Sequence, residues 1–376
     1  MIIKGQYNTA TVMIDDIDRS TYSQIQEFTN HEAFFGKPIV VMPDCHAGSG
    51  CCIGFTQPLG DKIVPNVVGV DIGCGVQSCR FPIKELDLES LDQFIRQNIP
   101  HGFSVGQRGQ EVNDLVRYMS DKIGTDADYA MASVGSLGGG NHFIEAGFDS
   151  NGDFWITVPS GSRNLGLKIA EYYTKLAEKH CADNGLEARG IAWLDRGSPE
   201  GAEYLEMQRF AVTYAAHNRR AIMDTIASHL KCEPFMEVDT IHNYIGAGDM
   251  IRKGAVSAKK GELLLIPFNM RDGIALCRGK GNPDWNSSAP HGAGRILSRG
   301  EAKRKLNVEA FQADMRSAGV YTTSADATTL DEAPAAYKDM QVILDCIKDT
   351  VDVVDMIRPV YNFKAGVVRK KTTGRE

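Results

Sequence analysis

The apolar positions of this chain form short clusters in its N-terminal part and helical stripes further along. Apolar runs bounded by glycine, proline and polar residues predict short, half-buried or buried strands. These predicted strands lie at residues 11–14, 39–42, 63–68, 154–158, 263–267 and 274–277. The N-terminal part, up to about residue 80, is therefore expected to consist mainly of short strands joined by glycine-containing loops.

A different spacing, with apolar residues three and four positions apart, predicts amphipathic helices. These predicted helices lie at residues 83–98, 109–123, 167–182, 200–230, 300–317 and about 334–357. The last is expected to begin after a cap at 331–334. Its apolar face would contain Met340, Ile343, Leu344, Ile347, Val351, Val354 and Ile357.

The composition is that of a globular protein, with 43% apolar and 24% charged residues among 376. The net charge of −7 argues against a surface coated for nucleic acid, but basic residues gather in 252–260, 278–305 and 364–375. No apolar run approaches the roughly 20 residues of a membrane helix, and no signal peptide is evident, which predicts a cytoplasmic protein. Nine cysteines without a Cys-x-x-Cys pair indicate reduced thiols.

Candidate metal ligands stand at the ends of predicted strands. The glycine-rich loop 69–75 carries Asp71 and Cys74, and two further loops carry His142 and His242. Such dispersed ligands suit a site that the fold assembles, although spacing alone does not show that they converge. On thiolate and imidazole ligands alone, zinc would be favoured over manganese.

Two segments have the features of phosphate sites. Arg163 follows the small residues 160–162 and precedes a predicted helix, whose amides at 166–169 would attract an anion. His291 lies in a glycine loop that is expected to open the helix at 300–317, with Arg295 and Arg299 nearby. A histidine among these cations suggests phosphoryl or nucleotidyl transfer with imidazole as the nucleophile.

Several motifs together resemble the RtcB-type RNA ligases and occur in that family's order from about residue 40 to 366. They are Val70-Asp71-Ile72-Gly73-Cys74-Gly75, Gly140-Asn141-His142-Phe143-Ile144-Glu145, Ser160-Gly161-Ser162-Arg163, Arg278-Gly279-Lys280-Gly281-Asn282, His291-Gly292-Ala293-Gly294-Arg295 and Asp331-Glu332-Ala333-Pro334. The resemblance implies an α/β fold of mixed α+β type. Residues 1–376 would form a single catalytic domain with mixed sheets around a central metal and nucleotide cleft.

The resemblance also implies a GTP- and Mn²⁺-dependent reaction. His291 would take a guanylyl group from GTP and pass it to an RNA 3′-phosphate, and a 5′-hydroxyl end would then displace GMP. A 2′,3′-cyclic phosphate would first be opened. The implied partners are RNA with these ends, GTP and an activating archease-type protein, with no membrane.

Residue by residue, the family's motifs assign three groups of side chains in this sequence. Metal ligands would be Asp71, Cys74, His142 and His242, with Cys74 bridging two ions. Nucleotide contacts would be Asn141, Glu145, Asn243, Ala293, Gly294, Tyr337 and Lys364. RNA phosphate or another anion would be bound by Arg163, Arg295 and Arg299.

Two departures from the family pattern leave alternatives open. Pro159 stands where the family usually has a metal-binding histidine, and 268–271 replaces a Gly-Ser-Met-Gly nucleotide loop, which leaves the guanine preference open. The chain could instead be a degenerate relative that acts as a cyclic-phosphate hydrolase or a 3′-end guanylyltransferase. A non-catalytic RNA-end binder using 278–305 is a third reading, and the sequence does not separate tRNA splicing from RNA repair.

Overall fold

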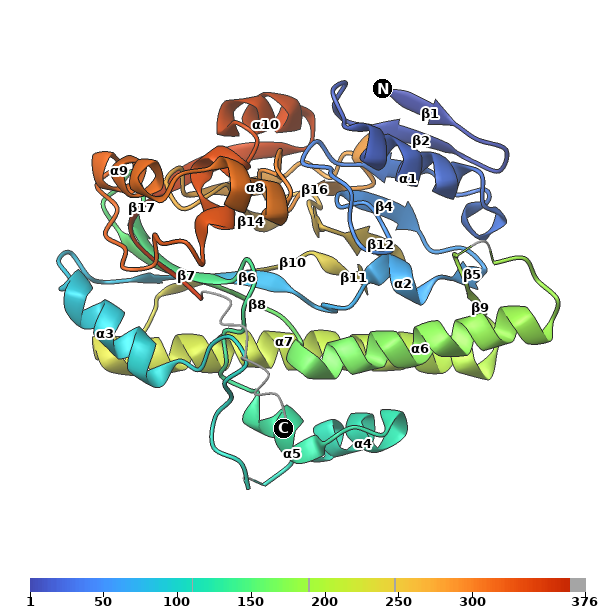
Figure 1. Ribbon diagram of the computed structural model, residues 1–376, viewed down its shortest axis with the longest axis horizontal. Coiled ribbons are helices and arrows are strands. Elements are labelled where there is room, and N and C mark those ends of the chain that lie inside the picture. The colour runs from blue at the N-terminus through green and yellow to red at the C-terminus, as the bar shows by residue number, and fades with distance from the viewer. Residues whose placement is uncertain (110, 189, 247, 366–376) are drawn as a thin grey trace, which may run out of the picture.

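The computed structural model describes residues 1–109, 111–188, 190–246 and 248–365. The basic stretch predicted at 364–375 therefore falls outside the described residues from 366 onward. Strands and helices alternate along the chain and build a mixed α/β structure (Figure 1), which confirms the predicted fold class.

Two large sheets form the framework of the described part of the chain. The first has six strands in the order β1 (Ile2–Lys4), β2 (Thr9–Val12), β3 (Ile39–Val41), β4 (Phe55–Pro58), β12 (Met250–Lys253) and β11 (Asn243–Gly246). The second has seven, in the order β10 (Met236–Ile241), β6 (Gly75–Phe81), β8 (Phe154–Ser160), β7 (Phe143–Phe148), β17 (Val351–Lys364), β15 (Ile274–Gly279) and β14 (Leu263–Pro267). Two short pairs complete the strands: β13 (Ala255–Ser257) with β16 (Ser288–Pro290), and β5 (Lys62–Ile63) with β9 (Leu194–Asp195).

The helices cover the sheets from several sides. The long helix α7 (Pro199–Leu230) runs beneath the seven-stranded sheet, and α6 (Arg163–Asp183) packs against α7 and lies below α2 (Pro65–Val68), β5 and β9 (Figure 1). The remaining helices are α1 (Arg19–Thr29), α3 (Leu88–Asn98), α4 (Asp114–Ile123), α5 (Ala127–Ala132), α8 (Arg299–Lys305), α9 (Val308–Ser317) and α10 (Met340–Cys346). Within residues that the model describes, no helix combines the length and apolarity needed to cross a bilayer.

The strand register brings distant loops to one place. Gly75, the first residue of β6, lies opposite Ser160 at the end of β8 and opposite Ile241 at the end of β10. Residues just beyond these three strand ends are therefore neighbours, although they come from three separate parts of the sequence. The chain also passes from the seven-stranded to the six-stranded sheet at His242, between β10 and β11.

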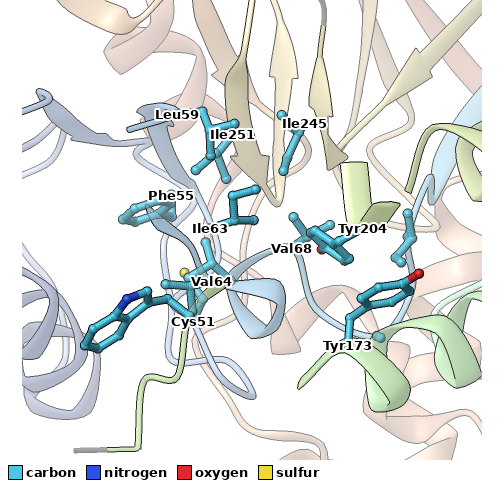
Figure 2. Packing of buried hydrophobic residues seen from close by; sticks show 14 of the residues in the cluster. Cys51, Phe55, Leu59, Ile63, Val64, Val68, Tyr173, Tyr204, Ile245 and Ile251 are labelled. Carbon is cyan, nitrogen blue, oxygen red and sulfur yellow. The ribbon is translucent and has the colours of Figure 1, made fainter. Parts of the chain in front are cut away.

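A large apolar cluster holds the approach to loop 69–75 in place (Figure 2). Ile63, Val64 and Val68 are buried, and they pack in the same cluster as Tyr173 of α6 and Tyr204 of α7. Burying side chains of this size stabilises the fold by roughly 1.5–3 kcal/mol each. The cluster therefore anchors the loop against the two long helices.

The strand predicted at 63–68 was wrong. Only Lys62–Ile63 is extended, and residues Pro65–Val68 form the short helix α2. Proline fixes φ near the helical value and needs no amide partner at the first helical position, so Pro65 starts a helical turn. Gly69 then ends it with φ 82°, a conformation that side chains rarely adopt.

The long C-terminal helix predicted to reach about residue 357 was also wrong. Helix α10 ends at Cys346, and Val351–Lys364 is the long strand β17, which lies inside the seven-stranded sheet between β7 and β15. Val351, Val353 and Val354 favour a strand because β-branched side chains lose rotamer freedom in helices. The spacing of the apolar residues in this segment is compatible with a helix or a strand. Pairing with β7 and β15 makes the segment a strand.

Other helix boundaries follow the capping side chains. Predicted helices 83–98 and 109–123 begin only at Leu88 and Asp114, because the Asp87 and Asn113 side chains accept first-turn amides. The helix predicted at 300–317 is broken into α8 and α9, since Asn307 caps a new start. The helices predicted at 167–182 and 200–230 are confirmed as α6 and α7, as is the strand pair β14–β15.

Candidate active site

A cavity of about 340 Å³ lies where the strand ends of the two large sheets meet. His291 follows β16, a strand of the two-stranded pair with β13, while Cys74 and His142 precede β6 and β7. Every predicted metal and nucleotide residue lines this cavity, together with His291, Arg295 and Arg299: Asp71, Cys74, Asn141, His142, Glu145, His242, Asn243, Ala293, Gly294, Tyr337 and Lys364. Of the predicted site residues, Arg163 alone does not line it.

Asp71, Cys74 and His142 form a group whose potential ligand atoms all lie within 4.8 Å of one another. Cys74 Sγ is 3.4 Å from His142 Nε2, which is 3.6 Å from Asp71 Oδ2. His142 Nδ1 lies 2.7 Å from the Leu137 carbonyl, and this contact turns Nε2 toward the group. One carboxylate, one thiol and one imidazole at these distances fit a single divalent metal ion.

The protonation of this group matches a metal site. Burial opposes ionisation of Asp71, but its contacts with His142 outweigh burial and hold the pKa of Asp71 below its ordinary value. Burial, and then the charge of Asp71, raise the pKa of the Cys74 thiol well above its ordinary value. Because Cys74 would bind a metal ion as the thiolate, the ion must displace the Cys74 proton. Metal binding should therefore depend on pH.

His242 does not belong to the three-residue group. Its ring centroid lies 4.8 Å from that of His291, and its buried Nδ1 has no hydrogen-bond partner among the described residues. Burial and the nearby His291 lower the pKa of His242 well below its ordinary value, which keeps the ring neutral and able to bind a metal. Pro159 also lines the cavity and offers no ligand atom there.

His291 is oriented by a buried carboxylate. Asp44, in the loop after β3, is fully buried, and its Oδ2 lies 2.7 Å from His291 Nδ1. A carboxylate at Nδ1 favours the tautomer with the proton on that nitrogen, and so leaves the Nε2 lone pair free. His291 precedes α8 by eight residues, so the expectation that its loop opens that helix was wrong.

Glu332 is the centre of a charged network on the opposite wall. The carboxylate accepts from Arg299 Nη1 at 2.6 Å, and it pairs with Lys364 Nζ at 2.9 Å and Arg295 Nη1 at 3.2 Å. Burial opposes ionisation of Glu332, but these cations outweigh it and lower the pKa to about 2. Tyr337 donates its hydroxyl to the same carboxylate. The predicted anion-binding residues Arg295 and Arg299 are therefore held in place by an internal carboxylate.

Glu145 is different, because burial dominates its surroundings. Burial raises the pKa of Glu145 to about 8, although a hydrogen bond from Asn362 at 2.9 Å and the charge of Lys364 oppose the increase. Its Oε1 has no partner in the described structure. A protonated Glu145 can donate a hydrogen bond into the cavity, and an ionised one can accept one.

Two buried residues of α7 hold the loops of the site together. Arg219 donates to both carboxylate oxygens of Asp239 at 2.7 Å, and to the carbonyls of Gly73 and Ser160 at 2.9 and 3.0 Å. Asn218 donates to the carbonyls of Ser136 and Gly161 at 3.0 and 3.2 Å and accepts the Ser136 amide. This Asn218–Arg219 clamp joins the metal loop to the two loops beside it.

The loop at 268–272, which departs from the family pattern, folds on itself. Asn269 accepts the backbone amides of Arg271 and Asp272 and donates to the Asp272 carboxylate at 2.7 Å. The Arg271 side chain pairs with Asp272 and with Asp314 of α9. Phe268, Asn269 and Met270 line the cavity.

Arg163 lies in a neighbouring cavity and is the first residue of α6. The helix thus begins four residues earlier than predicted, and its free first-turn amides belong to 163–165 and not to 166–169. The Arg163 guanidinium lies against Gly138, where any side chain would collide with it.

Sequence reasoning missed Asp44, Asn218 and Arg219, and it saw Glu332 only as part of a motif. Asp44 stands in a loop of small residues after a strand, which was a usable signal for a site carboxylate. Asn218 and Arg219 lie in a polar stretch of a long helix, where the sequence does not reveal that they face inward.

Comparison with known proteins gives a consistent result. The model of the family described as tRNA-splicing ligase RtcB matches residues 24–132 and 117–365. The RNA-splicing ligase RtcB of Escherichia coli strain K12 is 33% identical over 373 residues, covering 88% of this chain and 91% of that protein. The tRNA-splicing ligase RtcB of Aeropyrum pernix is 27% identical over 400 residues, covering 80% and 82%.

The raised pKa of Glu145 predicts a pH-dependent stability. Between its ordinary value of 4.5 and about 8, folded Glu145 keeps a proton that the unfolded chain releases. Its contribution to the free energy of unfolding should therefore fall with rising pH, by up to about 1.4 kcal/mol per pH unit. In urea unfolding with chelator present, the free energy of unfolding of the unaltered protein should fall relative to that of Glu145→Gln as the pH rises from 5 to 8. A constant difference would contradict the prediction.

The clamp predicts a contrast between two neighbouring arginines. Arg219→Ala leaves Asp239 and two carbonyls without a donor and should lower the free energy of unfolding by about 3 kcal/mol. Arg220→Ala removes only exposed ion pairs with Asp224 and Glu237 and should cost less than about 1 kcal/mol. Urea unfolding measures both, and equal losses would show that the clamp is not special.

Proposed function

Because this chain belongs to the RtcB family of tRNA-splicing ligases, we propose that it joins RNA ends through a guanylylated His291. The observation that carries the proposal is the 2.7 Å contact between His291 Nδ1 and the fully buried Asp44. This contact prepares Nε2 as a nucleophile inside a cavity that also contains a group of metal ligands.

In the proposed reaction, His291 Nε2 attacks the α-phosphorus of GTP, and the bond to the β-phosphate breaks to release pyrophosphate. An RNA 3′-phosphate oxygen then attacks the same phosphorus, and the bond to His291 breaks as the imidazole leaves. A 5′-hydroxyl oxygen finally attacks the RNA phosphorus and displaces GMP. An RNA 2′,3′-cyclic phosphate is opened to a 3′-phosphate beforehand. Asp44 supports both steps at His291 by stabilising positive charge on the ring.

Asp71, Cys74 and His142 would hold a Mn²⁺ ion, and His242 stands beside them as a further ligand. A bound divalent ion neutralises charge that develops on phosphate oxygens during transfer. Lys364, Arg295 and Arg299 add fixed positive charge from the opposite wall, where Glu332 keeps them in position.

The remaining cavity residues would bind the guanine nucleotide. Glu145 and Asn141 offer hydrogen-bonding groups on one wall, and Tyr337, with Ala293 and Gly294, forms another. Asn243 lies beside them. Since the cavity takes walls from both large sheets, we also propose that the chain acts as one catalytic domain. An archease-type protein is a candidate activator by family membership.

Pro159 favours a second candidate function. With Pro159 in the cavity and His242 outside the three-ligand group, one metal ion is better provided for than two. A protein with one ion could form the His291 adduct and cap RNA 3′-ends without sealing them. Joining of two RNA fragments distinguishes a ligase from such a guanylyltransferase.

The proposal predicts a covalent adduct. Incubation with α-labelled GTP and Mn²⁺ should label the unaltered protein and the control His217→Ala, whose exposed side chain lies on α7. His291→Ala should give no adduct. Asp44→Asn should form it at least about 100-fold more slowly, because an amide at Nδ1 permits the wrong tautomer. Absence of label at every Mn²⁺ concentration would refute the proposal, and an adduct without joined RNA would favour the second function.

The metal site predicts a gain of binding on substitution. Pro159→His introduces an imidazole into the cavity two positions along the sheet register from Cys74. Calorimetry should show tighter binding of a second Mn²⁺ ion than in the unaltered protein, with Pro159→Ala as the matched control. Unchanged stoichiometry and affinity in Pro159→His would contradict this prediction.

A further inference from the structure

A second cavity, of about 830 Å³, lies on the other side of the glycine loop that precedes His142. Asn141 faces the first cavity, whereas Gly139 and Gly140 line the second, and Lys364 lines both. The two cavities are therefore neighbours separated by a thin wall of backbone. A volume of this size falls within the roughly 300–1,000 Å³ of ligand-binding clefts.

The charge of this second cavity is mainly positive. Arg96, Arg163 and Lys364 line it, and Asp326 is the one carboxylate among its described lining residues. Asp92 and Glu332, which pair with Arg96 and Lys364, are not among those lining residues, so the cations and not their partners face the cavity. Arg96 is preorganised, because its Nε donates to Asp92 at 2.9 Å and its guanidinium lies 4.9 Å from the centre of the Phe363 ring. Arg163 donates to Ser136 at 3.3 Å and forms no ion pair within the described chain.

An exposed aromatic side chain that the described residues leave largely uncovered stands at this cavity. Phe103 is 71% exposed, an unusual state for a large apolar ring, while Tyr129 on the same cavity is half-buried. Exposed rings beside a cationic groove are the usual means of holding single-stranded nucleic acid, since bases stack on the ring and cations bind the phosphates. Hydroxyl groups of Ser104 and Thr328 offer hydrogen bonds to ribose.

We propose that this second cavity binds a nucleotide of the RNA strand next to the end that enters the first cavity. Phe103 stacks on the base, and Arg96 and Arg163 hold the backbone phosphates. This inference rests on the RNA-joining function proposed above and adds a subsite to it. Either of the two RNA strands to be joined could occupy the subsite, since both offer bases and backbone phosphates. One strand ends in a 3′-phosphate and the other in a 5′-hydroxyl.

Binding of short RNA without GTP tests this subsite, because no covalent step then takes part. Two fluorescent hexanucleotides are titrated by anisotropy, one with a 3′-phosphate and one with a 5′-hydroxyl, each blocked at its other end. For at least one RNA, Phe103→Ala should weaken binding at least about five-fold, and Phe103→Trp should restore it. Arg96→Gln should weaken binding and reduce the salt dependence by about one phosphate contact. The RNA that is affected identifies the strand.

Two matched controls exclude a general surface effect. Phe35 is also 71% exposed but lies outside the residues lining either cavity, and Arg220 is an exposed arginine on α7. Phe35→Ala and Arg220→Gln should bind both RNAs as the unaltered protein does. Thermal unfolding of every variant identifies any loss of fold, which is not expected for Phe103 because most of its side chain is exposed.

The subsite is overturned if Phe103→Ala and Arg96→Gln bind both RNAs as tightly as the unaltered protein, or if all four substitutions weaken binding equally. Adduct formation by the unaltered protein is measured separately. A protein that forms no adduct but shows the Phe103 and Arg96 effects contradicts the guanylylation and keeps the subsite. A protein that forms the adduct but lacks those effects supports the guanylylation and contradicts the subsite.

Discussion

The buried guanidinium of Arg219 is the interaction on which the geometry of the cavity depends. It joins α7 to Asp239 of β10 and to the carbonyls of Gly73 and Ser160, so one side chain connects three strand ends. Burying a charge is costly unless every donor has a partner, and here each nitrogen of Arg219 has one. Asn218 extends the same connection to the loop that carries His142. The loops that carry the candidate metal ligands are thus held by this neighbour, in addition to the contacts that Asp71, Cys74 and His142 make with one another.

Close packing around the clamp leaves room only for glycine. A side chain at Gly161 would meet Asp71, and one at Gly75 would meet both the Thr240 carbonyl and Arg219. These glycines do more than permit turns. Because they have no side chain, the backbone at Gly161 can lie against Asp71, and the backbone at Gly75 can lie against Arg219. Glu332 plays a comparable part on the opposite wall, where it holds three cations around one carboxylate.

Much of the secondary structure could be predicted from local patterns, and most errors have a physical reason. Helices α6 and α7 and the pair β14–β15 follow from periodicity, whereas α2 and β17 do not. Pro65 converts an apolar run into a helical turn, and tertiary pairing makes a strand of Val351–Lys364. Candidate ligands could be found because Asp, Cys and His are side chains that bind metals, and here they stand next to predicted strands. The convergence of these ligands could not be predicted, since it depends on strand register. The inward orientation of Arg219 could not be predicted either, because the sequence of its helix does not indicate it.

The contact between Asp44 and His291 joins residues 247 positions apart, and Lys364 of the last strand closes the same cavity. During synthesis, strands β1 to β4 cannot complete this cavity by themselves, because His291 and Lys364 are made long after them. Contacts of such separation also form late in folding, since closing a long loop must come first. A chain cut before Lys364 would therefore lack one wall of this cavity, although most of its other lining residues would be present.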